Sequence, residues 1–255
     1  MKRLMCHLVA GYPDLALSLR AAEGMVSGGA TYLEVQFPFS DPTADGPTIQ
    51  EACVKALEAG FTVEKGFQLV HTLMKQFPQV PLFIMSYASP VVRRGIEWFL
   101  DRAKDAGAIG LIVPDLPFDQ DEGYFQAAWD RGLHPVAVVV PSMDLHRLDK
   151  LLSFLESNNE HYLYVALRTG ITGDPTELSG INLSFLKDLQ DKGFKPLAGF
   201  GISSPEQVSS LENFVDAAVV GSYLVGIIRD TASKGAETLR EAVAKAVSRL
   251  TAHQP

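Results

Sequence analysis

The sequence predicts an α/β fold, a (β/α)8 or TIM barrel, from three observations. Eight short apolar runs alternate with helical patterns along 255 residues, which fits the strand count and the length of such a barrel. The runs are almost continuously aliphatic, as strands of a parallel sheet buried on both faces are. No G-x-G-x-x-G motif follows the first run, although the competing fold, a doubly wound open sheet, often has one there. No linker or break in composition divides the chain, so we expect one barrel domain over residues 1–255.

The expected strands are short stretches of aliphatic, aromatic or β-branched residues, most of them ended by Gly, Pro or polar residues. In chain order they cover 4–10, 32–37, 81–86, 109–114, 134–140, 162–167, 196–200 and 216–221. Helices are expected at 14–28, 47–59, 63–76, 92–106, 119–131, 144–157, 183–192, 204–212 and 235–252, with a short extra helix at 223–228. Ser203 and Glu206 have the spacing of a capping box with Pro205 in the first turn, and Gly107 stands where a helix should end.

Composition excludes several classes of function. The chain has 22 basic and 30 acidic residues, a net charge of −8, which disfavours a nucleic acid or an anionic membrane as partner. A bound phosphate would therefore have to be held by backbone N–H groups. The 2 cysteines and the scattered histidines have no metal-ligand spacing, so we expect no metal and a reducing cytoplasm. No apolar run reaches the ~18 residues of a membrane span, and the N-terminus lacks the features of a signal peptide.

The most informative stretch is LEVQFPFSDPTADGPTIQ, residues 33–50. It begins as a strand in which one acid, Glu34, interrupts an apolar run. Alternation along the strand puts Glu34 and Gln36 on one face and Val35 on the other, so Glu34 points into the barrel if Val35 meets the helices. A buried carboxylate is costly unless it has a partner or a task. We interpret Glu34 as a general acid/base; the alternative is a buried acid paired with Lys or Arg.

The segment after this strand is dense in Pro, Ser, Asp and Gly, so it is expected to be a shaped loop. It carries Asp41 and Asp45. Aspartate in such a loop commonly forms turns by bonding local N–H groups, and composition alone does not raise either residue above that interpretation.

Two loops that follow expected strands are long for this fold, at residues 38–46 and 168–180, and we expect both to build or cover the site. Three glycine-containing turns predict a phosphate site. They are Thr172-Gly173, the run Gly199–Ser203 with Phe200 and Gly201, and Gly221-Ser222 before the short extra helix. A phosphate at the seventh and eighth loops and such a helix N-terminus is a recurrent barrel feature.

Four other residues stand at or near strand ends. His7 in the first strand could face the pocket or be a core histidine with its hydrogen bonds satisfied, and we interpret it as the latter. Tyr87, Asp115 and Tyr164 could equally pack or bind.

Taken together, these motifs resemble the tryptophan synthase α subunit family. Residues 33–50 are similar to its signature, LE-x-G-x-PFSDP-x-ADGP-x-IQ, and the resemblance spans nearly the whole chain. It continues in AGYPD (10–14), Tyr87, PDLP (114–117), TGITG (169–173), GFGIS (199–203) and VVGS (219–222).

The resemblance implies a (β/α)8 barrel that cleaves indole-3-glycerol phosphate to indole and glyceraldehyde 3-phosphate by retro-aldol chemistry. It implies Glu34 as the acid/base and Asp45 as the group that stabilises positive charge at the indole nitrogen. It further implies that Tyr164 lines the site and that Thr172 braces Asp45. Phosphate would be held at Gly173, Gly201, Gly221 and Ser222, next to Phe200.

The same resemblance implies an αββα complex with a β subunit that carries pyridoxal phosphate, and no cofactor in this chain itself. Asp41 and Pro42 resemble the docking region for that subunit. The chain begins almost at its first strand, so we expect the helix that covers the barrel bottom in many members to be absent.

Three positions depart from the family pattern. Gln36 replaces a glycine and would fill space near the indole or hydrogen-bond to Glu34, while His7 replaces an apolar or aromatic residue and Ser89 an asparagine. They leave two alternatives to a working lyase: a non-catalytic or altered subunit that binds a glycerol-phosphate ligand and activates a β partner, or a related barrel with another substrate.

Overall fold

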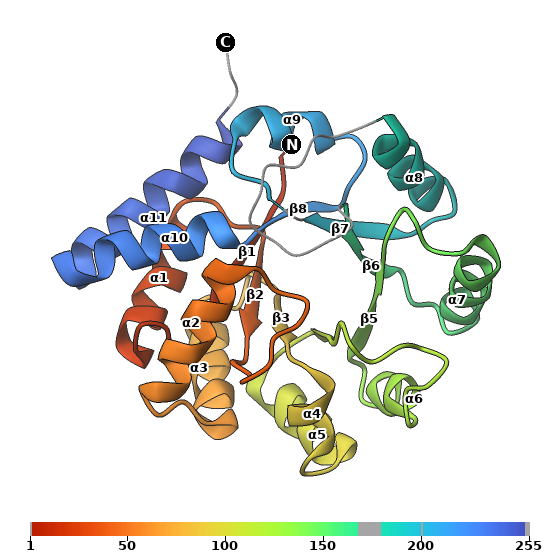
Figure 1. Ribbon diagram of the computed structural model, residues 1–255, viewed down its shortest axis with the longest axis horizontal. Helices are drawn as coiled ribbons and strands as arrows, with labels where there is room; N and C mark the ends of the chain where they lie inside the picture. The colour runs from red at the N-terminus through yellow and green to blue at the C-terminus, as the bar shows by residue number, and fades with distance from the viewer. Residues whose placement is uncertain (1, 168–179, 200, 253–255) are drawn as a thin grey trace.

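The computed structural model describes residues 2–167, 180–199 and 201–252. Eight parallel strands pair in sequence order, and β8 pairs with β1 to close the barrel. The helices lie around the strands as an outer ring (Figure 1). The predicted (β/α)8 barrel is thus confirmed, and the open doubly wound sheet is excluded because that sheet would leave two strand edges unpaired.

The elements alternate along the chain as the sequence predicts. The strands are β1 (Leu4–Val9), β2 (Tyr32–Gln36), β3 (Leu82–Met85), β4 (Gly110–Ile112), β5 (His134–Val139), β6 (Tyr162–Ala166), β7 (Lys195–Gly199) and β8 (Ala217–Val220). The helices are α1 (Leu15–Ser27), α2 (Pro47–Glu58), α3 (Val63–Gln76), α4 (Ala88–Val92), α5 (Ile96–Ala106), α6 (Tyr124–Trp129), α7 (Leu145–Ser157), α8 (Gly180–Asp191), α9 (Pro205–Leu211), α10 (Ser222–Thr231) and α11 (Ala236–Thr251), with a 3-10 turn at Ala232–Lys234.

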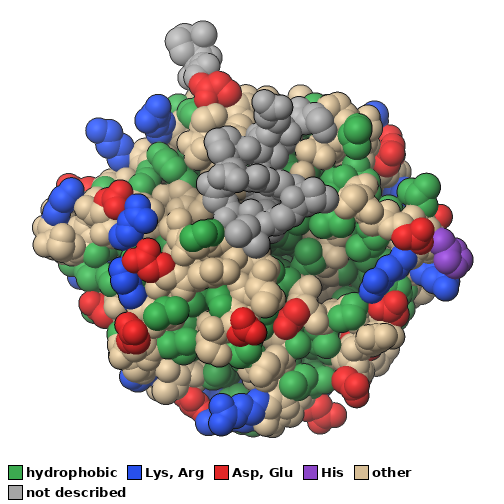
Figure 2. Space-filling view, viewed as in Figure 1, with side chains coloured by type: hydrophobic (Ala, Val, Ile, Leu, Met, Phe, Trp, Pro, Cys, Tyr) green, Lys and Arg blue, Asp and Glu red, His purple; other side chains and the backbone are tan. Residues whose placement is uncertain are grey.

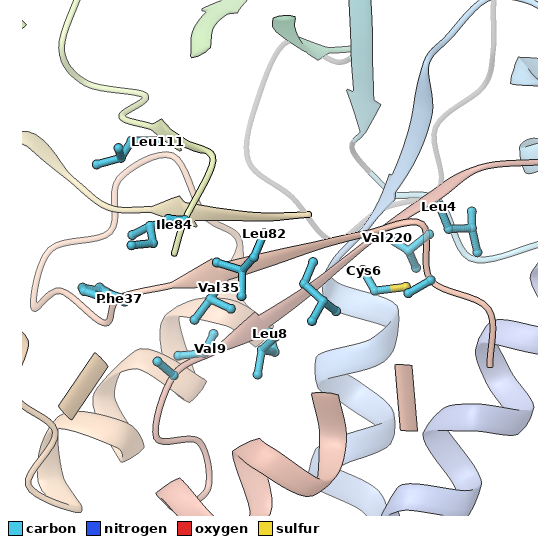
Figure 3. Close-up of a cluster of buried hydrophobic side chains, with 14 of the residues drawn as sticks. Leu4, Cys6, Leu8, Val9, Val35, Phe37, Leu82, Ile84, Leu111 and Val220 are labelled. Carbon is cyan, nitrogen blue, oxygen red and sulfur yellow. The ribbon is translucent and has the colours of Figure 1, made fainter. Parts of the chain in front are cut away.

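Each strand separates two apolar layers. One face packs against the helices, and Figure 3 shows side chains of this layer, among them Val35 of β2 and Leu82 and Ile84 of β3. The other face fills the barrel interior, where Phe83, Met85, Ile112, Val136, Leu197 and Val219 belong to a separate buried cluster. Because Val35 meets the helices, Glu34 and Gln36 point into the barrel, as the alternation predicts.

Three helix predictions need correction. The helix expected at 92–106 begins only at Ile96, as α5, because Gly95 before it has a φ of 97° that no continuous helix admits. Residue 92 instead ends a separate short helix, α4, which was not predicted. The helix expected at 119–131 covers only the six residues of α6, which begins after Gly123. The capping box lies one residue later than predicted, with Ser204 as the N-cap and Gln207 as its partner, so that Pro205 takes the first helical position.

Two other helix predictions are confirmed. Gly107 ends α5 in the left-handed conformation at a φ of 94°. The extra helix after β8 exists and is longer than expected, since α10 runs from Ser222 to Thr231. Within the described ranges no helix is both long and apolar enough to cross a lipid bilayer.

Candidate active site

Glu34 and His7 face each other inside the barrel. The two residues are register partners on the adjacent strands β2 and β1, so their side chains leave the sheet side by side. Nδ1 of His7 lies 3.1 Å from Oε2 of Glu34, and the two side chains are only 5% and 3% exposed. Glu34 therefore does have an ion-pair partner, but the partner is a histidine of β1 and not the Lys or Arg of the alternative interpretation.

Asp45 is held at the mouth of the barrel by donors from two strands. The Tyr87 hydroxyl, just after β3, donates to Oδ2 of Asp45 at 2.7 Å, and Nε2 of Gln36 donates to the same oxygen at 2.7 Å. The Tyr87 hydroxyl also accepts from the Ala44 N–H at 3.1 Å, and Nε2 of Gln50 donates to the Asp45 carbonyl at 2.8 Å. These bonds fix both the carboxylate and the backbone of its loop against β3 and α2.

Burial and charge perturb the titration of these groups. Burial raises the pKa of Asp45 above its ordinary value, although His7, Tyr87 and Gln36 act in the opposite direction. Burial acts to lower the pKa of His7. The nearby carboxylate of Glu34 above all, together with Asp45 and Gln36, acts in the opposite direction, and the net result is a raised pKa. The pKa of Tyr164 is raised by burial and by the same two carboxylates, so its hydroxyl stays protonated. Such concentrated perturbation is typical of functional sites.

These residues open onto a pocket with apolar walls. Its polar lining consists of His7, Glu34, Asp45, Tyr164 and Ser222, with Gly201 and Gly221. The apolar lining comes from Ala44, Ile49, Met85, Ile112, Pro114, Val138 and Val219. Apolar side chains line a hollow on the face shown in Figure 2, while many of the charged side chains lie nearer its outline. An apolar slot with a few convergent polar groups suits an aromatic substrate with one reactive polar centre.

One side of this pocket ends at a helix N-terminus. Gly221 is the N-cap of α10, and the N–H groups of Leu224 and Val225 already bond to its carbonyl at 2.9 and 3.1 Å. The backbone N–H groups of the first turn before Leu224 have no such intrahelical partner, so with Ser222 they can bind an anion. Gly201 lies on the same wall with a φ of 76°.

Most of the predicted site residues thus share one pocket: Glu34, Asp45, Tyr164, Gly201, Gly221 and Ser222. Thr172, Gly173 and Phe200 lie outside the described residues. Asp41 is exposed and Pro42 is buried, and both belong to the loop before α2 and not to the pocket lining. Oδ1 of Asp115 accepts from the Ala88 N–H at 2.8 Å, which ties it to the start of α4.

Two interpretations of individual residues were wrong. His7 is not a core histidine with its hydrogen bonds satisfied, because it lines the pocket and contacts Glu34, and its Nε2 has no hydrogen-bond partner among the described residues. Gln36 does not bond to Glu34; its amide instead donates to Asp45 and lies 3.5 Å from Sγ of Cys53. The register of β1 against β2 decides both outcomes, and no single strand reveals that register.

The apolar pocket wall went unrecognised at the sequence level. Met85, Ile112, Val138 and Val219 all stand at or next to the C-terminal ends of their strands, on the inward face. They were missed because alternation was applied only to β2, starting from Glu34. The same alternation applied to the C-terminal end of every strand would have identified these inward positions.

Among the residues that the structure describes, no group of three or more His, Cys, Asp or Glu side chains is placed to hold a metal ion. Cys6 and Cys53 are both buried free thiols, and burial raises the pKa of Cys53 to about 12. Acid-base chemistry by Glu34, His7 and Asp45 is what this pocket can supply from its own side chains.

Fold and site together define a class: a (β/α)8 barrel with an acid-base pocket at the C-terminal mouth, where barrel enzymes carry their active sites. Within that class, the chain belongs to the tryptophan synthase alpha chain family, whose family model matches residues 1–253. It is 40% identical over 238 residues to the tryptophan synthase alpha chain of Helicobacter hepaticus, covering 91% of this chain and 88% of the relative. The corresponding chain of Carboxydothermus hydrogenoformans is 36% identical over 230 residues, with coverage of 90% and 84%.

Solved structures agree with this family. A Mycobacterium tuberculosis tryptophan synthase structure superposes with a TM-score of 0.84 at 28% identity, covering 99% of this chain and 93% of that one. The tryptophan synthase A-subunit of Pyrococcus furiosus gives a TM-score of 0.83 at 30% identity, with 97% of both chains covered.

Proposed function

We propose that this chain is a carbon–carbon lyase that cleaves indole-3-glycerol phosphate to indole and glyceraldehyde 3-phosphate, as the α subunit of tryptophan synthase in L-tryptophan biosynthesis. The observation that carries this is the presence of Glu34 and Asp45, both almost fully buried, in one apolar pocket at the mouth of the barrel. Membership of the family supports this reaction, and the two carboxylates can supply what it needs, a proton-transfer group and a negative charge beside the indole nitrogen.

The chemistry requires an acid and a base on one side of the indole. The bond between C3 and the side chain breaks only after C3 is protonated, because the resulting C=N bond can accept the bonding electrons. Glu34 delivers that proton and then removes the proton of the side-chain hydroxyl, whose oxygen becomes the aldehyde. Asp45 hydrogen-bonds to the ring N–H and stabilises the positive charge that develops on the nitrogen.

The phosphate belongs at the wall that the loops after β7 and β8 form. Gly201, Gly221 and Ser222 lie along it, and the first turn of α10 offers backbone N–H groups and the positive end of a helix dipole. Thr172, Gly173 and Phe200, outside the described residues, stay predictions for the same binding site. Tyr164 lines the same pocket.

The proposal includes a partner. As an α subunit the chain would join a β subunit in an αββα complex, with Asp41 and Pro42 in the docking region. Pyridoxal phosphate would reside in the β subunit, and this chain would work without a cofactor of its own. A cytoplasmic location follows from the pathway and from the free thiols Cys6 and Cys53.

The test is an assay of the purified chain with indole-3-glycerol phosphate, alone and with a tryptophan synthase β subunit. Release of glyceraldehyde 3-phosphate that rises when the β subunit is added is the expected result. A rate of glyceraldehyde 3-phosphate release that does not change when the β subunit is added would contradict the partnership and indicate an enzyme that produces indole on its own.

The alternative, an altered or non-catalytic subunit, has one observation in its favour. His7 occupies one side of Glu34 inside the pocket, so the acid/base is not free to face a substrate from every direction. A folded chain that binds glycerol phosphate and activates the β subunit without releasing aldehyde would support this alternative and contradict the lyase.

A further inference from the structure

The imidazole of His7 and the carboxylate of Glu34 form a buried acid-base pair within the pocket. Their strands are held in register over five residue pairs from Met5↔Tyr32 to Val9↔Gln36, so the two side chains leave the sheet next to each other. Nδ1 and Oε2 are 3.1 Å apart, although Oε2 has no hydrogen bond of good geometry to any residue that the structure describes. The pair is close enough to exchange a proton after a small rotation of either side chain.

The surroundings of His7 favour the protonated ring. On the β2 side it faces Glu34, and Asp45 of the next loop adds a second negative charge. Gln36 also stabilises the charged form. On the other side stand uncharged groups, with Gly221 packed against the ring and Ser222 and Val219 on the same pocket wall. Three further titratable groups lie near the two carboxylates: Tyr164, Tyr87 and Cys53. All three stay neutral because burial raises the pKa of each well above its ordinary value.

We propose that His7 shares the catalytic proton with Glu34 and so acts as a positioning residue for the acid/base. This inference rests on the proposed lyase function and deepens it. This chain thus has a second proton carrier at 3.1 Å from the first, at a position where the resemblance implies an apolar or aromatic residue in many members. His7 keeps the proton in the free enzyme and leaves Glu34 as a carboxylate ready to receive it.

Over one catalytic cycle, the protons that Glu34 and His7 give up equal the protons that they take back. The imidazolium of His7 passes a proton to Glu34, and Glu34 gives it to C3 of the indole, which leaves the ring nitrogen positively charged beside Asp45. The Glu34 carboxylate then takes the proton of the side-chain hydroxyl, the carbon–carbon bond breaks, and its electrons neutralise the ring nitrogen. Glu34 returns the proton to His7, so the pair ends as it began and no other reactant is needed.

The first experiment measures the pair without relying on turnover. The ring Cε1–H signals of the 6 histidines are followed by NMR across pH, and His7 is assigned by its loss in His7→Phe. We expect His7 to titrate above the ordinary value of 6.5. In Glu34→Gln its midpoint should fall by at least about one unit, since an opposite charge within ~4–6 Å shifts a pKa by about 1–3 units. An ordinary midpoint that Glu34→Gln leaves unchanged would overturn the pairing.

The second experiment separates proton sharing from simple packing. His7→Asn keeps an N–H that can reach Glu34 but cannot titrate, whereas His7→Phe restores the apolar residue of the family. We expect both to lower kcat about tenfold or more with KM changed less than threefold, and to remove the alkaline limb of the kcat/KM profile that deprotonation of His7 causes. His71→Asn, on an exposed position of α3, is the matched control and should leave kcat and the profile unchanged.

Each result decides the proposal. His7→Asn with wild-type kcat and an unaltered pH profile would overturn proton sharing and leave His7 as packing. A wild-type chain that shows the coupled NMR titration but no turnover would contradict the proposed function, and proton delivery with it, while the pairing would stand. Circular dichroism of each variant checks its fold, and His7→Asn serves as the readout if His7→Phe does not fold.

Discussion

The hydroxyl of Tyr87 donates to Oδ2 of Asp45 at 2.7 Å, inside the barrel mouth. Tyr87 follows β3 and is fully buried, whereas Asp45 belongs to the loop after β2. The bond therefore joins two successive loops of the active-site face and sets the direction of the carboxylate. The same hydroxyl accepts from the Ala44 N–H at 3.1 Å, so one oxygen orders both the side chain and the backbone of that loop.

Tyr87→Phe should weaken both functions of this hydroxyl. It leaves the partly buried N–H of Ala44 without its acceptor and takes one donor from the buried carboxylate of Asp45, so we expect a loss of about 1–3 kcal/mol in the free energy of unfolding, measured in urea. We also expect a lower kcat, because an undirected Asp45 stabilises the indole nitrogen less well. Tyr124→Phe is the matched control: within the described part of the chain the buried Tyr124 hydroxyl has no hydrogen-bond partner, so its removal should be neutral or stabilising.

Glu34→Gln should abolish the proton transfers and leave the fold intact. The amide has nearly the shape of the carboxylate, but it neither gives nor takes a proton at C3, so kcat should fall by about 10²–10⁴. Steady-state release of glyceraldehyde 3-phosphate measures this, with circular dichroism as the check on folding. Wild-type turnover in this variant would remove Glu34 from the mechanism.

Gly28→Ala should test how closely α1 and α11 pack. A Cβ at Gly28 would lie 2.5 Å from the carbonyl oxygen of Ala244 and 2.7 Å from Cβ of Val247, so the helices would have to separate. We expect a destabilisation of about 1–3 kcal/mol by thermal or urea unfolding. Gly226→Ala in α10 is the control, since a Cβ there meets nothing within 4 Å and should stabilise by about 0.5–1 kcal/mol. Equal effects at the two sites would mean that α1 can move at little cost.

The sequence predicts the strands well because their signal is local. All eight observed strands lie within two residues of the expected bounds at either end. Alternation along one strand also predicts that Glu34 points inward if Val35 meets the helices, and the structure shows that Val35 does so. Both features depend on alternation, which any apolar run displays.

His7 shows where local reasoning ends. Nothing within β1 says that its ring meets a carboxylate, since that contact depends on the parallel register in which His7 pairs with Glu34. Gln36 is similar: its amide reaches Asp45 only because the loop after β2 folds back over the mouth, held by Tyr87 from the next strand. Contacts between elements decide these roles, and a one-dimensional pattern contains only contacts within an element.

Asp45→Asn should raise stability at neutral pH while lowering activity. Burial raises the pKa of Asp45 in the folded state. The contribution of Asp45 to stability is therefore fully present below the pKa of 3.8 in the unfolded state, and it is lost as pH rises through the higher pKa of the folded state. Ionised Asp45 therefore destabilises the fold at pH 7, and a neutral amide should recover about 0.5–2 kcal/mol, as relief of a function-linked cost commonly does. Urea unfolding of both proteins at several pH values measures this, and the gain should shrink toward pH 3.8.

A surface aspartate whose pKa is lowered on folding is the control for Asp45→Asn, because the pKa of Asp45 is raised. The Arg131 guanidinium beside Asp101, with Nε 2.6 Å from Oδ1, lowers the pKa of that exposed carboxyl. The small contribution of Asp101 to stability is thus present at pH values above the pKa of the unfolded state and is lost as pH falls. Asp101→Asn should therefore be neutral or slightly destabilising at pH 7. If Asp45→Asn were instead less stable than the wild type at pH 7, the attraction of His7 and the two hydrogen bonds to Oδ2 would outweigh burial. Asp45 would then be a structural anchor of the loop as well as a charge for the indole nitrogen.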